Sequence, residues 1–355
     1  MKHPPFMLLG ILILLVGLWA GLTRIGWPFP GLSLAMVHGP LMVSGFLGTL
    51  IGMERAVAFG RSWAFAAPLL ASAGALLAAF GVPAPVPAFL IVLASIVLVG
   101  VHAGFVVRQQ SVSMTVMGIG AVLWWMGNTV WLSGRPVFEA VHWWAGFVTL
   151  TILGERFGLS RMLAPSLLSR GTFYLANVLV LAGLATTLLA PGTGTRVLGA
   201  GLIVALAWIL RYDISRRTIR QPGLPRFVAV SLAGGGLWLG VAGVLLIVFG
   251  AVPAGPYYDA IVHAVFVGFV FSMIFGHAPI VLPLVMKVSV SFMPFLYVPL
   301  VLLHVSLLLR VIADLMISMH GRQWSGLLNT VAILLFFAAI ASSAIRSTRQ
   351  PAKPA

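Results

Sequence analysis

The sequence predicts an all-α polytopic protein that crosses a membrane about twelve times. Of its 355 residues, 61% are hydrophobic and only 8% are charged, and its mean hydropathy is +1.10. A soluble domain carries about 25% charged residues, so the composition excludes an ordinary soluble protein. A helix needs ~20 mostly apolar residues to cross the hydrocarbon core, and the chain has room for about twelve such helices and little else. We therefore expect residues 1–355 to form one transmembrane domain.

The individual helices are delimited by clusters of turn residues. Apolar runs alternate with Pro, Gly and Arg, which end helices or prevent their continuation. The first run follows Lys2 without a convincing small-residue cleavage site, so we interpret it as the first helix and not as a signal peptide. The predicted helices cover residues 6–23, 31–54, 63–81, 87–108, 112–132, 137–157, 172–190, 195–212, 227–250, 258–286, 291–313 and 324–345.

The distribution of basic residues predicts the topology. When both termini and the link after every second helix are placed on one side, that side holds all but five of the 21 Lys and Arg residues. The five on the other side are Arg24, Arg135, Arg196, Arg310 and Arg322. Basic loops face the cytoplasm, so we expect both termini and the link 211–226 to be cytoplasmic in a bacterial inner membrane. Orientation then explains the net charge of +15, and no nucleic-acid partner is expected.

Three helices share one internal pattern. The stretches 36–55, 140–156 and 259–283 each begin with a Val-His pair and pass through Gly-Phe, and nine residues after that Gly each has an ionisable side chain. These positions are His38, Gly45 and Glu54; His142, Gly146 and Glu155; and His263, Gly268 and His277. The helices lie four apart in the predicted order, which indicates three pseudo-repeated four-helix units at about 1–108, 109–213 and 227–346.

The repeated residues should form two layers. His263 and His277 are separated by 14 residues, which corresponds to ~21 Å along a helix. One layer holds the three Val-His histidines near the outer helix ends. The other holds Glu54, Glu155 and His277 near the inner ends, and His102 should join it. The direction of each histidine around its helix axis can be measured from the Gly-Phe of the same helix, at 100° per residue. The directions of His38 and His142 then differ by ~60°, whereas His263 is turned well away. Pairwise or separate ligation therefore suits the spacing better than one metal with three imidazoles.

The outer histidines are candidate ligands of a prosthetic group. The chain has no cysteine, which excludes thiolate metal sites and a covalently attached haem. Imidazole alone suits haem iron, copper or zinc. His304 on the eleventh helix could join this layer or serve as a hydrogen-bonding residue. Gly residues on the second and tenth helices leave space for a flat macrocycle or for close helix contact. A Trp-rich group at 124–125 and 143–144 fits an interfacial belt or stacking on a cofactor.

The inner layer has two interpretations. Ionisable groups within membrane helices are costly, so Glu54, Glu155, His277 and His102 could conduct protons. Alternatively, Glu54-Arg55 and Glu155-Arg156 anchor helix ends at the interface through local ion pairs.

These features together resemble the catalytic subunit of haem–copper oxidases, and in character most closely the NnrS family, membrane haem–copper proteins associated with nitric oxide metabolism. The resemblance covers nearly the whole chain in topology. It implies that His38 and His263 hold a haem b and that His142 binds copper. The oxidases have a close histidine pair on the tenth helix and two adjacent histidines on the seventh; here the second histidine is His277, and residues 172–190 contain none. A haem, alone or with an incomplete metal site at His142 and His304, is what the resemblance leaves.

We therefore expect a membrane-integral haem-binding or haem/copper-binding protein of nitric oxide or respiratory redox metabolism. It would be a binder or an oxidoreductase acting on a small diatomic or nitrogen oxide, in contact with membrane lipid and with an electron-donor protein or quinol. The alternative is a proton- or ion-coupled transporter or channel that uses Glu54, Glu155 and His277. A third interpretation is an assembly factor without chemistry of its own.

Overall fold

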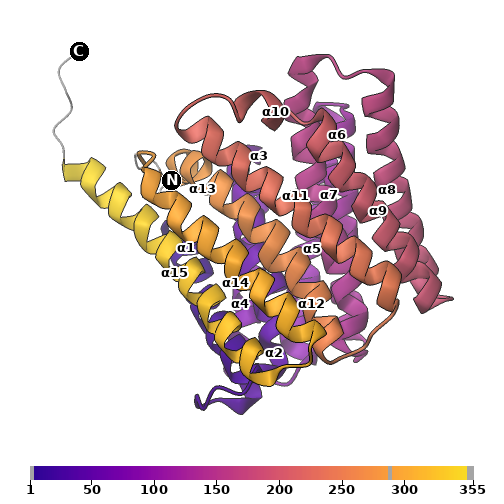
Figure 1. Ribbon diagram of the computed structural model, residues 1–355, viewed down its shortest axis with the longest axis vertical. Helices are drawn as coiled ribbons and strands as arrows, with labels where there is room; N and C mark the ends of the chain where they lie inside the picture. Colours follow the sequence, from indigo (N-terminus) through magenta and orange to yellow (C-terminus); the bar gives the residue numbers. More distant parts are fainter. Residues whose placement is uncertain (1–3, 287–289, 350–355) are drawn as a thin grey trace. The chain divides into compact units, whose positions relative to one another are not determined.

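The computed structural model describes residues 4–286 and 290–349, which are mainly helical and contain no strand. These residues form two compact units, one of residues 4–162 and one of residues 163–349. Figure 1 shows the helices in sequence colours. The helices of the first unit are α1 (Pro4–Arg24), α2 (Leu32–Pro40), η1 (Leu41–Leu47), α3 (Gly48–Phe59), η2 (Ser62–Phe65), α4 (Ala66–Ala79), α5 (Pro85–Arg108), α6 (Val112–Leu132), α7 (Val137–Ser160) and η3 (Arg161–Leu163), whose last residue begins the second unit.

The second unit also consists of helices joined by short connections. Its helices are α8 (Leu167–Thr187), α9 (Pro191–Tyr212), α10 (Ser215–Thr218), α11 (Leu224–Phe249), α12 (Pro256–His263), η4 (Ala264–Phe271), α13 (Ser272–Met286), η5 (Pro294–Leu296), α14 (Tyr297–Leu315) and α15 (Met319–Arg349). Within each unit, helices adjacent in sequence pack side by side, as α6 does with α7, α8 with α9, and α14 with α15. Short turns between antiparallel helices favour this arrangement.

The predicted all-helical class is confirmed, and each of the twelve predicted ranges is largely helical. In the described part of the chain, eleven helices are long and apolar enough to cross a membrane, as in a multi-pass membrane protein. α6 is not among the eleven, although it is 21 residues long, because its Trp, Gly and Asn residues lower its mean hydropathy. A twelfth span therefore stays a prediction, as do the three four-helix units. The predicted link 211–226 contains the short helix α10.

Two of the three patterned helices contain a π-helix. η1 begins three residues after His38, and η4 begins directly after His263. Pro40 precedes η1 and has no N–H to donate to the preceding turn, which loosens the α-helical pattern at that point. A π-helix is hydrogen-bonded from i to i+5, so each of its turns holds an additional residue. The spacing argument that turned His263 away from the other histidines assumed a uniform α-helix, and it fails because a π-helix lies between the histidine and the Gly in both helices.

Candidate functional site

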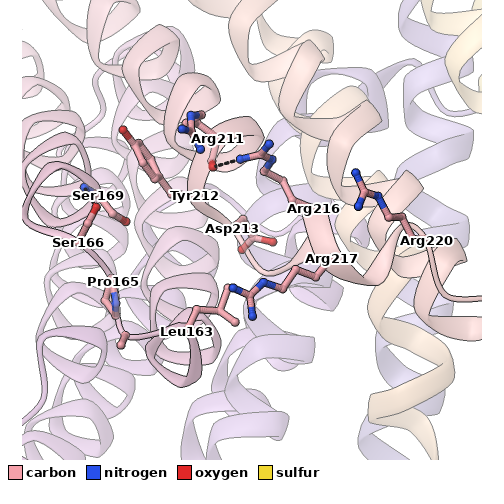
Figure 2. Close-up of a pocket in the computed structure, with 11 residues that line it drawn as sticks. Leu163, Pro165, Ser166, Ser169, Arg211, Tyr212, Asp213, Arg216, Arg217 and Arg220 are labelled. Carbon is pink, nitrogen blue, oxygen red and sulfur yellow. Dashed lines mark hydrogen bonds between the residues drawn. The ribbon is translucent and has the colours of Figure 1, made fainter.

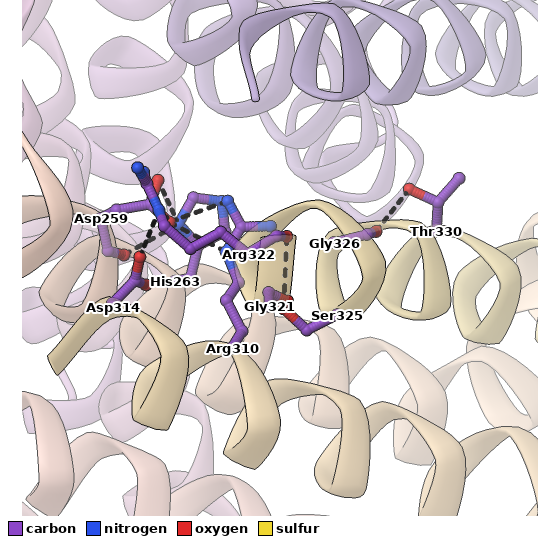
Figure 3. A network of polar contacts seen from close by, with 9 residues as sticks. All are labelled: Asp259, His263, Arg310, Asp314, Gly321, Arg322, Ser325, Gly326 and Thr330. Carbon is purple, nitrogen blue, oxygen red and sulfur yellow. Dashed lines mark hydrogen bonds and ion pairs between the residues drawn. The ribbon is translucent and has the colours of Figure 1, made fainter. Parts of the chain in front are cut away.

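Three helix ends of the second unit bring five ionisable residues together inside the protein. We call them the charged cluster: Asp259 and His263 from α12, Arg310 and Asp314 from α14, and Arg322 from α15. Figure 3 shows the side chains converging from the three helices. α11 is 26 residues long and separates this end of the unit from α10, so the two ends lie ~39 Å apart along that helix.

Asp259 is the centre of the charged cluster. Its Oδ2 atom lies 2.9 Å from Nε and 2.8 Å from Nη2 of Arg310, and 3.7 Å from Nη2 of Arg322. Arg322 also forms an ion pair with Asp314, with 2.6 Å between Nε and Oδ1, although the angle is not that of a hydrogen bond. Two carboxylates thus face two guanidinium groups. The pairing compensates for the loss of hydration that burial imposes on each charge.

His263 is held at the edge of this cluster. Its Nδ1 atom lies 2.9 Å from the backbone carbonyl oxygen of Asp259 and 3.4 Å from Oδ1 of the same residue. A carbonyl oxygen only accepts hydrogen bonds, so Nδ1 carries the hydrogen and the lone pair of the neutral ring is on Nε2. Arg310 in turn fixes the Asp259 carboxylate. Histidines that bind metals are typically oriented in this way through their other ring nitrogen.

His38 has the same kind of support in the first unit. Its Nδ1 atom lies 2.8 Å from the carbonyl oxygen of Gly17 on α1, which again places the lone pair on Nε2. Gly21, one turn further along α1, provides space for the ring. A Cβ atom added at Gly21 would lie 2.8 Å from Cε1 of His38. His38 belongs to the first unit and His263 to the second.

The two predicted copper ligands differ in their surroundings. His142 is half-buried on α7 and hydrogen-bonded to the backbone of Phe138, one turn earlier. His304 on α14 accepts a hydrogen bond at Nδ1 from Nε1 of Trp238, at 2.9 Å. Its Nε2 atom is buried without a hydrogen-bond partner in the described residues. Because Trp238 can only donate, His304 carries its hydrogen on Nε2, so metal ligation there would require this bond to break. The structure therefore shows the hydrogen-bonding alternative for His304, and its role as a ligand stays a prediction.

The predicted proton-path residues are divided between the units. Glu54 and Glu155 meet at Arg55, whose Nη2 atom lies 3.0 Å from Oε1 of Glu54 and 3.7 Å from Oε2 of Glu155. His102 on α5 is only 1% exposed, and neither of its ring nitrogens has a hydrogen-bond partner in the described residues. His277 lies in the second unit, with Nδ1 3.0 Å from the carbonyl oxygen of Met273.

A hydrogen-bonded core of the first unit was not foreseen from the sequence. Oδ1 of Asn128 accepts from Oγ of Ser44 at 2.8 Å and from Nε1 of Trp144 at 2.9 Å. Oγ of Ser44 accepts in turn from Nε1 of Trp124, at 3.1 Å. Trp124 and Trp144 are fully buried, so the predicted interfacial belt is wrong for them, whereas Trp125 is 40% exposed. These indoles carry donors that need partners when buried, and the core supplies them.

In the patterned helices, the space beside several glycines is occupied by neighbouring side chains. A Cβ atom at Gly48 would collide with the ring of Trp124, and one at Gly268 would collide with Trp238. A Cβ atom at Gly45 would collide with the side chains of Ala75 and Ile13. At these positions the structure shows close helix contact and not a space for a macrocycle. Among the described residues, no group of three or more His, Asp or Glu side chains could hold a metal ion. An iron that takes its equatorial ligands from a porphyrin needs only one or two imidazoles.

Comparison with known proteins gives one match. A family model described as "Domain of unknown function (DUF8744)" matches residues 4–345, which is nearly the whole chain. The chain belongs to the DUF8744 family. No curated protein and no solved structure matches this DUF8744 chain. The charged cluster and both π-helices lie within the matched residues.

The charged cluster of the DUF8744 chain could have been suspected from its composition. Asp259 and Asp314 are two of only six acidic residues in the chain, and both lie within apolar helices. Arg310 and Asp314 are four residues apart, so they lie on one helix face. The sequence pattern nevertheless contained no signal that would pair α12 with α14 and α15, because the residues are separated by 51 positions or more.

Proposed function

We propose that this protein binds haem in a bacterial inner membrane and that His263 of the second unit and His38 of the first unit are ligands of haem iron. The observation that carries the proposal is the support of His263. Its Nδ1 atom faces the carbonyl oxygen and the carboxylate of Asp259, and Arg310 fixes that carboxylate. This chain of contacts supports a ligand role because it fixes both the tautomer and the direction of the ring.

Three further observations support the same function. His38 is oriented by the Gly17 carbonyl in the same manner, and Gly21 makes room for its ring. The chain has no cysteine, which excludes thiolate ligation, and neutral imidazole is a ligand that suits iron. Both histidines precede a π-helix. π-Helices are rare in proteins, and those that occur are frequently found at functional sites. When bound, the haem would supply one-electron transfer or binding of a small diatomic molecule.

Within this proposal, the protein's own residues position the histidine ligands and shield the haem. The charged cluster holds α12, α14 and α15 together at the end where His263 lies. Most Lys and Arg residues fall on one predicted side of the membrane, together with both termini, which supports a cytoplasmic location of the termini. An electron-donor protein or a quinol would serve as the redox partner, and His142 would be the donor for copper if a second metal is held.

The test is the absorption spectrum of the full-length protein, produced with haem supplied and purified in detergent. We expect a Soret band and stoichiometric iron, and we expect His38→Ala and His263→Ala each to abolish or shift the band. His320→Ala is the matched control, because His320 is exposed on α15, and it should leave the spectrum unchanged. Circular dichroism checks that each variant is folded. A colourless, iron-free protein, or folded His38→Ala and His263→Ala variants with unaltered haem, would refute the proposal.

A proton- or ion-coupled transporter or channel is the second candidate. It is favoured by His102, whose buried ring nitrogens have no hydrogen-bond partner among the described residues, and by the buried Nε atom of Arg55 in the same unit, which has no partner among them either. Buried groups of this kind are stable only with water or ions beside them. In proteoliposomes, this function predicts proton or ion flux that is lost in Glu155→Gln and His102→Leu while the proteins stay folded. The absence of flux across a panel of ions would exclude it.

A further inference from the structure

One end of the second unit contains a hollow with strongly basic walls. It lies between the loop that precedes α8, the end of α9 and the short helix α10, and its volume is about 540 Å³. Four arginines line it, Arg211, Arg216, Arg217 and Arg220, against one acidic residue, Asp213. Figure 2 shows Ser166 and Ser169 on the side of the hollow that faces these arginines.

The single carboxylate does not neutralise the four guanidinium groups. Asp213 is 1% exposed, and its Oδ1 atom accepts a hydrogen bond from the backbone N–H of Ser215 at 2.7 Å. It therefore serves to fold the turn between α9 and α10. The walls of the hollow keep a net positive charge, which attracts anions.

Two of the four arginines are already engaged within the protein. Arg216 donates from Nη1 to the backbone carbonyl of Arg211, at 2.9 Å, and the Arg211 guanidinium lies 5.4 Å from the centre of the Tyr212 ring. Arg217 and Arg220 make no side-chain hydrogen bond or ion pair with the described residues, and both are exposed. Figure 2 shows Arg217 extending toward Leu163 across the hollow. The planar guanidinium groups of Arg217 and Arg220 carry donors whose geometry matches the oxygens of a phosphate.

The surface beside the hollow is apolar. Leu167 and Leu168, in the first turn of α8, are 86% and 69% exposed. α8 and α9 are both long and apolar enough to cross a membrane. A ligand that meets the arginines and these leucines together must combine an anionic group with hydrocarbon chains. Basic pockets at the ends of membrane helices bind anionic lipid head groups in this way.

We propose that this hollow binds the phosphate of an anionic phospholipid through Arg217 and Arg220, with its acyl chains along α8 beside Leu167 and Leu168. The hydroxyl of Ser166 lines the same hollow and can donate to a phosphate oxygen. The site is independent of haem binding, since it lies at the end of the unit opposite the charged cluster.

The test is native mass spectrometry of the full-length protein in detergent, titrated with phosphatidylglycerol or with zwitterionic phosphatidylcholine. We expect one phosphatidylglycerol to bind with a clear preference over phosphatidylcholine. The double variant Arg217→Gln/Arg220→Gln should weaken that binding by roughly thirty-fold, as expected from two guanidinium contacts. The control is Arg61→Gln/Arg346→Gln, which removes the same charge at two exposed positions outside the hollow and should bind like the unmodified protein.

Equal binding of the two lipids, or unchanged binding by Arg217→Gln/Arg220→Gln, would overturn the proposal. Inorganic phosphate alone forms the second arm: if it binds as tightly as phosphatidylglycerol and displaces it, the ligand is a free phosphate and the lipid source is wrong. Should the double variant fail to fold, a photoactivatable phosphatidylglycerol on the unmodified protein decides. Cross-links at Leu167 and Leu168 support the proposal, and cross-links confined to other helices contradict it.

Discussion

Arg310 binds the same carboxylate oxygen of Asp259 with two of its nitrogens, Nε at 2.9 Å and Nη2 at 2.8 Å. The two side chains are 7% and 10% exposed, so each depends on the other for its stability inside the protein. This ion pair joins α12 to α14.

Asp259→Asn should destabilise the protein by about 3–5 kcal/mol, because it leaves the buried guanidinium of Arg310 without its counter-charge. Thermal or denaturant unfolding in detergent, followed by circular dichroism, measures the change. The double variant Asp259→Asn/Arg310→Met should lose less than the single variant, since no unpaired charge remains.

The matched control for this ion pair is Glu139→Gln. Glu139 pairs with Arg135 at a helix start in the first unit, where the Arg135 side chain is 57% exposed. Exposed pairs contribute about 0–1 kcal/mol, so the control should unfold almost like the unmodified protein. Equal losses in Asp259→Asn and Glu139→Gln would show that burial does not govern the pair.

Asn128→Leu should destabilise the first unit. The change removes the acceptor for Ser44 and Trp144 and leaves buried donors unpaired, at about 1–3 kcal/mol for each such group. Unfolding measurements test this, together with near-ultraviolet circular dichroism of the buried indoles. Thr129→Val, at the next position on α6 but exposed, should have little effect. A neutral outcome for Asn128→Leu would mean that the hydrogen-bonded core contributes nothing to stability.

Gly48→Ala should lower stability by about 1–3 kcal/mol, because the added methyl group overlaps the ring of Trp124 in a tightly packed interior. Gly171→Ala on α8 meets nothing within 4 Å and should be neutral or slightly stabilising, since alanine favours a helix over glycine. Comparison of the two melting temperatures checks the prediction. It fails if Gly48→Ala is as stable as Gly171→Ala.

Gly21→Ala should disturb haem binding without unfolding the protein. The new Cβ atom would lie 2.8 Å from Cε1 and 3.1 Å from Nδ1 of His38, so the ring must turn and its bond to the Gly17 carbonyl must weaken. We expect a shifted or weaker Soret band and less haem per protein. Gly10→Ala on the same helix has its nearest neighbour at 3.9 Å and should keep the spectrum. Identical spectra for the two variants would remove His38 from the set of ligands.

Much of the fold could be predicted from the sequence because hydrocarbon-spanning helices depend on local composition. The predicted range 112–132 agrees with α6 at both ends. The predicted start of the seventh helix at 172 was five residues late, because Ser166 caps α8 by accepting a hydrogen bond from the backbone N–H of Ser169. Glu54 and Glu155 were expected at one depth, and they meet at Arg55.

The rest depends on contacts between distant residues, which periodicity does not contain. Arg310 and Arg322 entered the sequence analysis only as charges on the less basic side, whereas the structure shows them holding Asp259 and Asp314. The π-helices were missed because a template of fixed period cannot represent an additional residue. The sequence left open whether the glycines of the patterned helices give space to a macrocycle or allow close helix contact. The structure shows Trp124 and Trp238 packed against two of them, and the local sequence does not determine where these two side chains lie.

The π-helix η4 also gives α13 its rotational setting. η4 accommodates one residue more than an α-helix of the same number of turns. If the same residues continued from α12 into α13 as an α-helix, α13 would turn by about 100° around its axis relative to His263. Ser272 and His277 would then face different neighbours although the sequence was unchanged. In this part of the protein, the width of a helical turn decides which side chains meet.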